Sequence, residues 1–199
     1  MACYSHDTIG RGIRWATCSP FGPRELRWPP SHVAIICDAP EVDDEPVWVE
    51  STTQCEHPCL VRGETVSGVQ VHRPAERIRD YEQCGGRVEL FRLTEINTFS
   101  SKESRLLSRI LIDHFARRGL QYDYTGALFS GTRVFPWTRL FPAVDLHSMF
   151  CSKMVAAVLM RLNRMNHENP TLFNPGRLLR RLVHTGKYAL VADRSAIRT

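Results

Sequence analysis

The chain has 199 residues, of which 43% are hydrophobic and 24% charged, and its 26 Lys and Arg exceed its 21 Asp and Glu to give a net charge of +5. Residues 1–199 are expected to form one domain, because this length buries a sizeable core. No apolar run reaches the roughly 18–20 residues of a membrane span, and residues 1–10 lack the apolar core of a secretory signal. We therefore expect a protein without a transmembrane segment or signal peptide, cytoplasmic or associated with a virion. The mild positive charge permits a polyanionic partner but does not select one.

The cysteines are odd in number and irregularly spaced, at positions 3, 18, 37, 55, 59, 84 and 151. Without an export signal, reduced thiols are the default.

The secondary-structure elements are predicted from the positions of Gly and Pro and from hydrophobic periodicity. Residues 1–30 are interrupted by Gly and Pro and are predicted to be irregular. Apolar runs and alternating patterns predict strands, and 3.6-residue spacing predicts helices. The strands are expected at 31–37, 47–52, 68–72, 88–93 and 187–191, and the helices at 74–83, 100–119, 150–162 and 174–186. Strands followed by helices indicate an α+β fold rather than a doubly wound sheet.

The helix that begins near Cys151 carries the first chemical signal. Apolar residues at 154, 155, 158, 159 and 162 give it one broad buried face. Cys151 lies in the first turn, where unpaired N–H groups and the positive end of the helix dipole favour a thiolate. A small buried cysteine is the alternative interpretation.

A thiolate nucleophile needs a proton acceptor and a group that orients that acceptor. His32 begins the first long strand and Glu50 lies near the end of the second, so the two side chains meet if these strands are neighbours of suitable direction. A structural histidine at the edge of the core and a surface carboxylate are the alternatives for the two residues taken singly.

The three blocks Ser31–Ile36, Val47–Ser51 and Phe150–Val155, with weaker support from Tyr122–Tyr124 and Asn174–Leu179, resemble the circularly permuted papain-like amidases of the YiiX-like branch of the NlpC superfamily. The resemblance implies a papain-like antiparallel sheet packed against helices, with the nucleophile at a helix N-terminus. It also implies Cys151 as nucleophile, His32 as base and Glu50 as orienting residue, and no cofactor or metal.

The function implied by this resemblance is a cysteine-dependent amidase or peptidase that cleaves an amide or ester through a thioester. Its substrate would be a peptide, a peptidoglycan stem peptide or a lipid acyl group. The Cys151 N–H and a second donor, Tyr124 or Tyr122, would hold the oxyanion, although packed aromatic residues are the alternative for both tyrosines. A relative without catalytic activity, used as a binding or assembly module in a virus particle for example, is the other function left open.

Two further patterns compete with the hydrolase interpretation. The run Cys55-Glu56-His57-Pro58-Cys59 invites a zinc site, but a second ligand pair is missing and Cys37 and Cys84 would have to supply it. Arginines at 161, 164, 177, 180 and 181 would form a basic strip suited to nucleic acid. A solvated helix face is the simpler interpretation of these arginines, so we do not expect nucleic acid as a partner.

Overall fold

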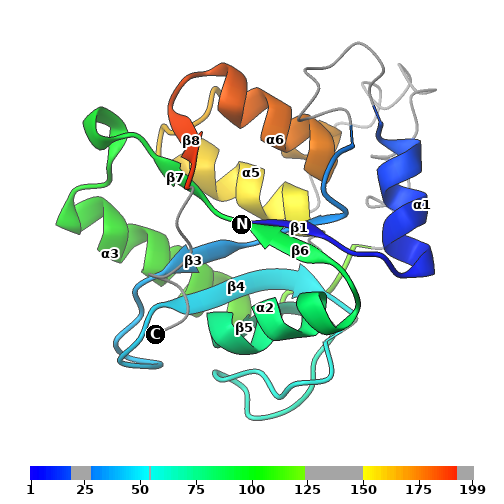
Figure 1. The fold of residues 1–199 in the computed structure, drawn as a ribbon. Helices are drawn as coiled ribbons and strands as arrows, with labels where there is room; N and C mark the ends of the chain where they lie inside the picture. Colours follow the sequence, from blue (N-terminus) through cyan, green and yellow to red (C-terminus); the bar gives the residue numbers. More distant parts are fainter. Residues whose placement is uncertain (19–27, 54, 124–149, 192–199) are drawn as a thin grey trace.

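The computed structural model describes residues 1–18, 28–53, 55–123 and 150–191, and these form an α+β fold (Figure 1). The strands are β1 (Ala2–Tyr4), β2 (His32–Val33), β3 (Ile35–Cys37), β4 (Val47–Thr52), β5 (Gly68–His72), β6 (Arg87–Glu89), β7 (Phe91–Leu93) and β8 (Tyr188–Leu190). The helices are α1 (Thr8–Ala16), α2 (Pro74–Gln83), α3 (Ser101–Arg109), α5 (Cys151–Arg161) and α6 (Pro175–His184). Short 3₁₀ turns occur at η2 (Glu95–Asn97) and η5 (Pro170–Leu172), and α3 continues as a π-helix, η3 (Ile110–Ala116).

The N-terminal segment differs from the expectation of an irregular chain, because it contains β1 and α1. Asp7 caps α1 through its side chain, which accepts from the N–H of Gly10. Strand β1 forms the centre of a three-stranded sheet of order β2-β1-β6. All three residues of β1 are buried, and the strand is held by its pairing with β2 and β6. It is too short to show the apolar pattern by which a strand is predicted from sequence.

Two of the predicted strands divide at the residue where the chain changes its pairing partner. The strand predicted at 31–37 divides at Ala34, whose backbone N–H and C=O are both paired with Met1. Strand β2 pairs with β1, whereas β3 pairs with β4. In the same way the strand predicted at 88–93 divides into β6, which pairs with β1, and β7, which pairs with β8.

The predicted helices are all present, with adjusted bounds. The capping box is formed as expected: the Ser100 side chain accepts from the N–H of Glu103, and the Glu103 carboxylate accepts from the N–H of Ser100. Gly119, with φ +65°, follows the end of this helix. No helix among the described residues is long and apolar enough to cross a bilayer.

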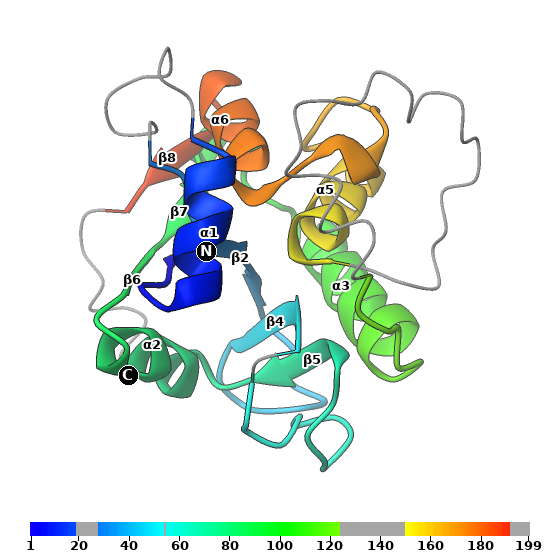
Figure 2. The ribbon, with the colours of Figure 1, turned by 90° about the vertical axis from the view of Figure 1, so that its right-hand side faces the viewer.

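The sheet β3-β4-β5 has two faces of different character. Its apolar face, with Val47, Val49, Val69 and Val71, belongs to the core that also includes α5 and η3. Its other face carries polar residues and lies toward α2; Figure 2 shows α2 on one side of β4 and β5, with α3 and α5 on the other. This polar face is where the candidate site is built.

Candidate active site

The antiparallel pairing of β3 and β4 brings His32 to Glu50. Ile35 is paired with Val49 and Ile36 with Trp48, so continuing the register by one residue sets Glu50 opposite Ala34. Because side chains alternate along a strand, His32 and Ala34 share a face, and His32 becomes a diagonal neighbour of Glu50. The sequence condition of neighbouring strands with suitable directions is therefore met.

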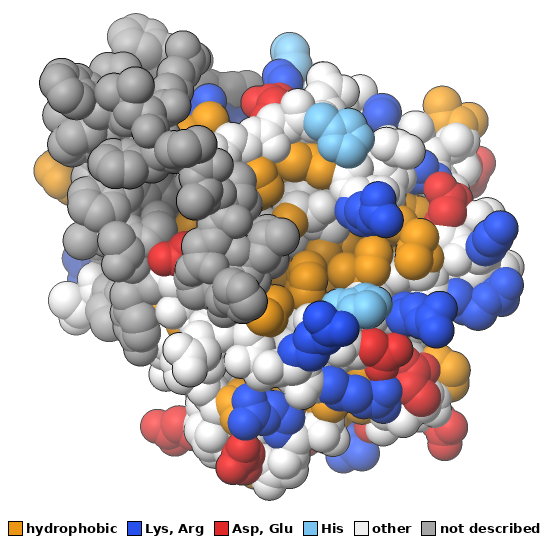
Figure 3. Space-filling view, turned by 180° about the vertical axis from the view of Figure 1, so that it is seen from behind, with side chains coloured by type: hydrophobic (Ala, Val, Ile, Leu, Met, Phe, Trp, Pro, Cys, Tyr) orange, Lys and Arg blue, Asp and Glu red, His pale blue; other side chains and the backbone are white. Residues whose placement is uncertain are grey.

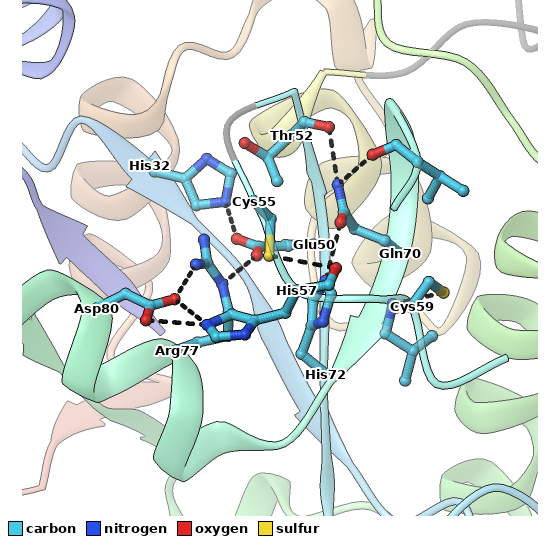
Figure 4. A network of polar contacts seen from close by, with 12 residues as sticks. His32, Glu50, Thr52, Cys55, His57, Cys59, Gln70, His72, Arg77 and Asp80 are labelled. Atoms are coloured by element: carbon cyan, nitrogen blue, oxygen red, sulfur yellow. Dashed lines mark hydrogen bonds and ion pairs between the residues drawn. The ribbon is translucent and has the colours of Figure 1, made fainter. Parts of the chain in front are cut away.

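Glu50 and His32 form an ion pair, with 2.8 Å between Glu50 Oε2 and His32 Nε2 (Figure 4). The carboxylate is fully buried, and 13% of the His32 side chain is exposed. Within the part of the chain that the structure describes, neither of these two atoms has a partner in hydrogen-bond geometry, so the contact is an ion pair. Since Nε2 faces Glu50, Nδ1 is the ring nitrogen left for another partner.

That partner is Cys151, at the first position of α5. His32 and the backbone N–H groups of Val33 and Ser152 interact with its thiol and act on its pKa. Phe150 is the N-cap residue and supplies no side-chain cap, so no capping side chain competes with the sulfur for the N–H groups of the first turn. The order of contact is therefore cysteine, histidine, carboxylate, built from residues up to 119 positions apart.

The charges in this group favour a thiolate and an imidazolium. Burial opposes ionisation of Cys151, but the charge of His32 and the hydrogen bonds to the sulfur outweigh it and lower the pKa of the thiol. Burial also opposes the imidazolium, yet attraction to Cys151 and Glu50 raises the pKa of His32 from 6.5 to about 10. Such an ion pair is a reactive nucleophile near neutral pH.

Arg77 is a member of the site that the sequence does not reveal. It extends from α2, is 6% exposed, and its Nε donates to Glu50 Oε1 at 2.6 Å. Burial opposes the Glu50 carboxylate, but the charges and hydrogen bonds of His32 and Arg77 lower its pKa to about 2. An arginine on a short polar helix ordinarily indicates a solvated surface, so no sequence signal identifies this contact.

The network continues outward from Arg77. Its Nη1 contacts Asp80 at 2.5 Å, and Asp80 in turn contacts Nε2 of His57 at 3.0 Å (Figure 4). Glu50 is thus fixed between two cationic groups, and one of these is itself held by a carboxylate. The contacts hold the Glu50 carboxylate in one orientation, which an orienting residue requires.

The tyrosines expected at the oxyanion site are not both described. Tyr124 lies outside the described residues, and Tyr122 is half-buried. Lys153, in the first turn of α5, is buried and forms an ion pair with Asp123 at 3.1 Å, which fixes the segment beside Tyr122 relative to the helix. The Cys151 N–H, at the first position of α5, has no partner within the helix.

The zinc site considered as an alternative for Cys55 and Cys59 is not assembled from this pair. Cys59 is turned to the backbone of β5, where its sulfur accepts from the N–H of Val71 at 3.3 Å. Cys55 instead lies with Glu50 and His72, one candidate ligand atom of each within 4.8 Å of the others. Among the described residues, this is the group of three or more such side chains that could hold a metal ion.

Two arginines of the alternative basic strip are paired with carboxylates. Arg164 contacts Glu103 at 2.8 Å, and Arg181 forms an ion pair with Glu168. On the face shown in Figure 3, Lys and Arg border a band of hydrophobic side chains, with Asp and Glu among them. This mixed surface is typical of solvated helix faces.

A largely apolar cavity of about 590 Å³ lies between α5, α6, β3 and β7. Val155 and Leu159 of α5 line it, and these follow Cys151 at four-residue steps along one side of the helix. Its size falls in the roughly 300–1,000 Å³ range of ligand pockets.

No protein-family model, curated protein or solved structure matches the chain.

Proposed function

We propose that this protein is a cysteine-dependent hydrolase with a permuted papain-like arrangement, in which Cys151, His32 and Glu50 act as nucleophile, base and orienting residue. The observation that supports the proposal best is the continuous contact from the helix-terminal sulfur through the imidazole to a buried carboxylate. A structural cysteine does not require a histidine that is itself oriented by a buried acid.

The reaction proceeds in two acyl-transfer steps. The Cys151 thiolate attacks the carbonyl carbon of an amide or ester, and the oxyanion is stabilised by the Cys151 N–H. The imidazolium of His32 then protonates the leaving amine or alcohol as the C–N or C–O bond breaks, which leaves a thioester. Neutral His32 next removes a proton from water, the hydroxide attacks the thioester, and the carboxylic acid departs as the thiolate is regenerated.

The apolar cavity supports a lipid acyl group over a peptidoglycan stem peptide as the substrate. Stem peptides are polar and charged, whereas this cavity runs beside Val33, next to His32, and along the side of α5 that begins at Cys151. Cys151 and His32 do not line the cavity themselves, so an acyl chain held there would approach the sulfur past Val33, next to His32, and Val155, one helical turn after Cys151. The function therefore predicts that reactivity rises with the length of the acyl chain.

The test is covalent trapping with a series of activated esters of increasing acyl length. Mass spectrometry should find one acyl group on Cys151, and the rate of its formation should increase from acetyl to long-chain esters. His32→Ala should slow the reaction at least 10²-fold, the scale of general-base catalysis, whereas Cys84→Ser, at an exposed cysteine, should not change it.

Acylation spread over several cysteines, or a rate that His32→Ala leaves unchanged, would instead support the binding or assembly module. Acylation of Cys151 with no dependence on chain length would retain the hydrolase and remove the lipid assignment. A peptide or stem-peptide substrate would then be preferred.

A further inference from the structure

A second group of chemically active side chains lies directly beside the His32–Glu50 pair. Glu50 on β4, Cys55 in the segment between β4 and β5, and His72 at the end of β5 are all buried, and one candidate ligand atom of each lies within 4.8 Å of the others. Cys55 and His72 have no role in the hydrolytic mechanism. Figure 4 shows these three side chains close to one another and beside His32.

His72 presents an unused nitrogen in this group. Its Nε2 lies 2.8 Å from the side-chain oxygen of Gln70. The Gln70 amide nitrogen donates to the backbone oxygens of Thr52 and Val66, at 2.9 and 3.1 Å, which fixes the orientation of the amide. A carbonyl oxygen only accepts, so Nε2 carries the proton and Nδ1 has a free lone pair.

The Nδ1 atom of His72 is buried and has no hydrogen-bond partner among the residues that the structure describes. Buried polar atoms are nearly always paired, and an exception needs an explanation such as an ion. A metal ligand explains it directly, because a ligating histidine typically donates its other ring N–H to a nearby oxygen. Gln70 supplies that oxygen here.

The remaining two side chains complete a donor set. Cysteine sulfur, imidazole nitrogen and carboxylate oxygen are the ligands of protein-bound zinc. The Glu50 carboxylate is supported from outside by Arg77, as ligating carboxylates commonly are. We propose that Glu50, Cys55 and His72 form an inhibitory site for Zn²⁺ or a chemically similar divalent cation, with water as the further ligand.

Binding balances charge by releasing a proton. The ion replaces the proton of the Cys55 thiol, which passes to solvent, and no oxidation or reduction occurs. The thiolate so formed and the Glu50 carboxylate offset the two charges of the ion, and this compensates for the repulsion by Arg77 nearby. We therefore expect a site of moderate affinity rather than a permanently occupied structural site.

The site shares Glu50 with the proposed triad, and inhibition follows from this shared residue. Oε1 of Glu50 is held by Arg77 and Oε2 by His32. A cation that coordinates Glu50 competes with His32 for Oε2, so the imidazole loses its orienting partner. The inhibitory effect rests on the proposed function, whereas binding of the ion does not.

Binding is tested in the Cys151→Ala variant, which removes the nucleophilic thiolate as a competing ligand. After treatment with a chelator, the protein is titrated with Cd²⁺ and Zn²⁺. We expect one equivalent of Cd²⁺ with a thiolate-to-metal charge-transfer absorption, and a rise in the unfolding midpoint with Zn²⁺. In the same background, Cys55→Ser should abolish the absorption and His72→Ala should weaken binding at least tenfold.

Cys59→Ser and Cys84→Ser are the matched controls, since both remove a cysteine outside the group, one buried and one exposed. Both should retain the absorption and the affinity. Absence of saturable binding at micromolar Cd²⁺ and Zn²⁺, or binding that Cys55→Ser leaves intact in a protein of normal unfolding midpoint, would overturn the site. An ordered water beside His72 Nδ1 would then account for the buried nitrogen.

Inhibition is tested with Cys151 intact, by comparing each protein's acylation rate with Zn²⁺ to its own rate without it. Zinc should slow the parent protein at concentrations that leave the Cys55→Ser ratio near one. Equal slowing of both proteins would show direct coordination by Cys151 and refute regulation through Glu50. Binding in the Cys151→Ala background would still be measured independently, so failure of the hydrolase proposal and failure of the metal site are distinguishable.

Discussion

Arg77→Met removes a buried cation from Glu50 and tests whether the carboxylate depends on it. Removing one partner of a buried ion pair costs about 3–5 kcal/mol, because it leaves an uncompensated buried charge. Arg77 and Glu50 have side-chain exposures of 7% and 0%, so solvent screens this pair little. His32 still contacts Glu50 at 2.8 Å, and we therefore expect a loss near the lower end, about 3 kcal/mol.

Urea unfolding measures this loss. With a slope of about 2 kcal/mol per molar urea, a change of 3 kcal/mol lowers the midpoint by about 1.5 M. Arg73→Met is the matched control, because Arg73 lies just before α2 and forms an exposed ion pair with Asp43. Its midpoint should stay close to that of the parent protein.

A double-mutant cycle decides whether the cause is the buried pair itself. Glu50→Gln alone leaves Arg77 buried without its partner, and the double variant Glu50→Gln, Arg77→Met removes both charges. The double variant should be less destabilised than the sum of the single variants by at least about 1 kcal/mol. Additive losses, or an unchanged midpoint for Arg77→Met, would refute the argument that Glu50 is held as a buried anion by Arg77.

Three further predictions concern the proposed nucleophile and the fold around it. Because the pKa of Cys151 is lowered, its alkylation in the presence of a chelator should remain fast below pH about 8.5, the ordinary thiol pKa. Mass spectrometry across a pH series should show this fast alkylation at Cys151. The variant His32→Ala should lose the fast alkylation at low pH. Gly68→Ala should destabilise the protein by about 1–3 kcal/mol, because φ is +123° and a methyl group there would overlap a backbone carbonyl oxygen. Gly12→Ala is the control: this glycine lies in α1 with open space around it, so the change should stabilise the protein by about 0.5–1 kcal/mol. Equal urea unfolding midpoints for the two variants would contradict this explanation. Met154→Ala, fully buried in α5 beside the nucleophile, should cost about 2–5 kcal/mol in urea unfolding, and a smaller loss would mean that the surrounding core collapses into the space.

Local patterns in the sequence were sufficient to predict the helices after residue 70, but not α1, and one side of the site. The capping box at Ser100 and the apolar spacing after Cys151 are encoded within a few residues, so both helix starts could be predicted. The meeting of His32 with Glu50 could be predicted as a condition on strand direction, because alternation already placed each residue on a known face of its strand.

Tertiary structure decided the features that depend on partners distant in the chain. Strand β2 separates from β3 at Ala34 because that residue pairs with Met1, and no local pattern marks this change of partner. Arg77 and His72 become buried only because α2 covers the polar face of the sheet and Gln70 lies beside His72 on β5. Sequence periodicity specifies which face a side chain occupies, whereas the identity of the group opposite it is set by how separate elements pack.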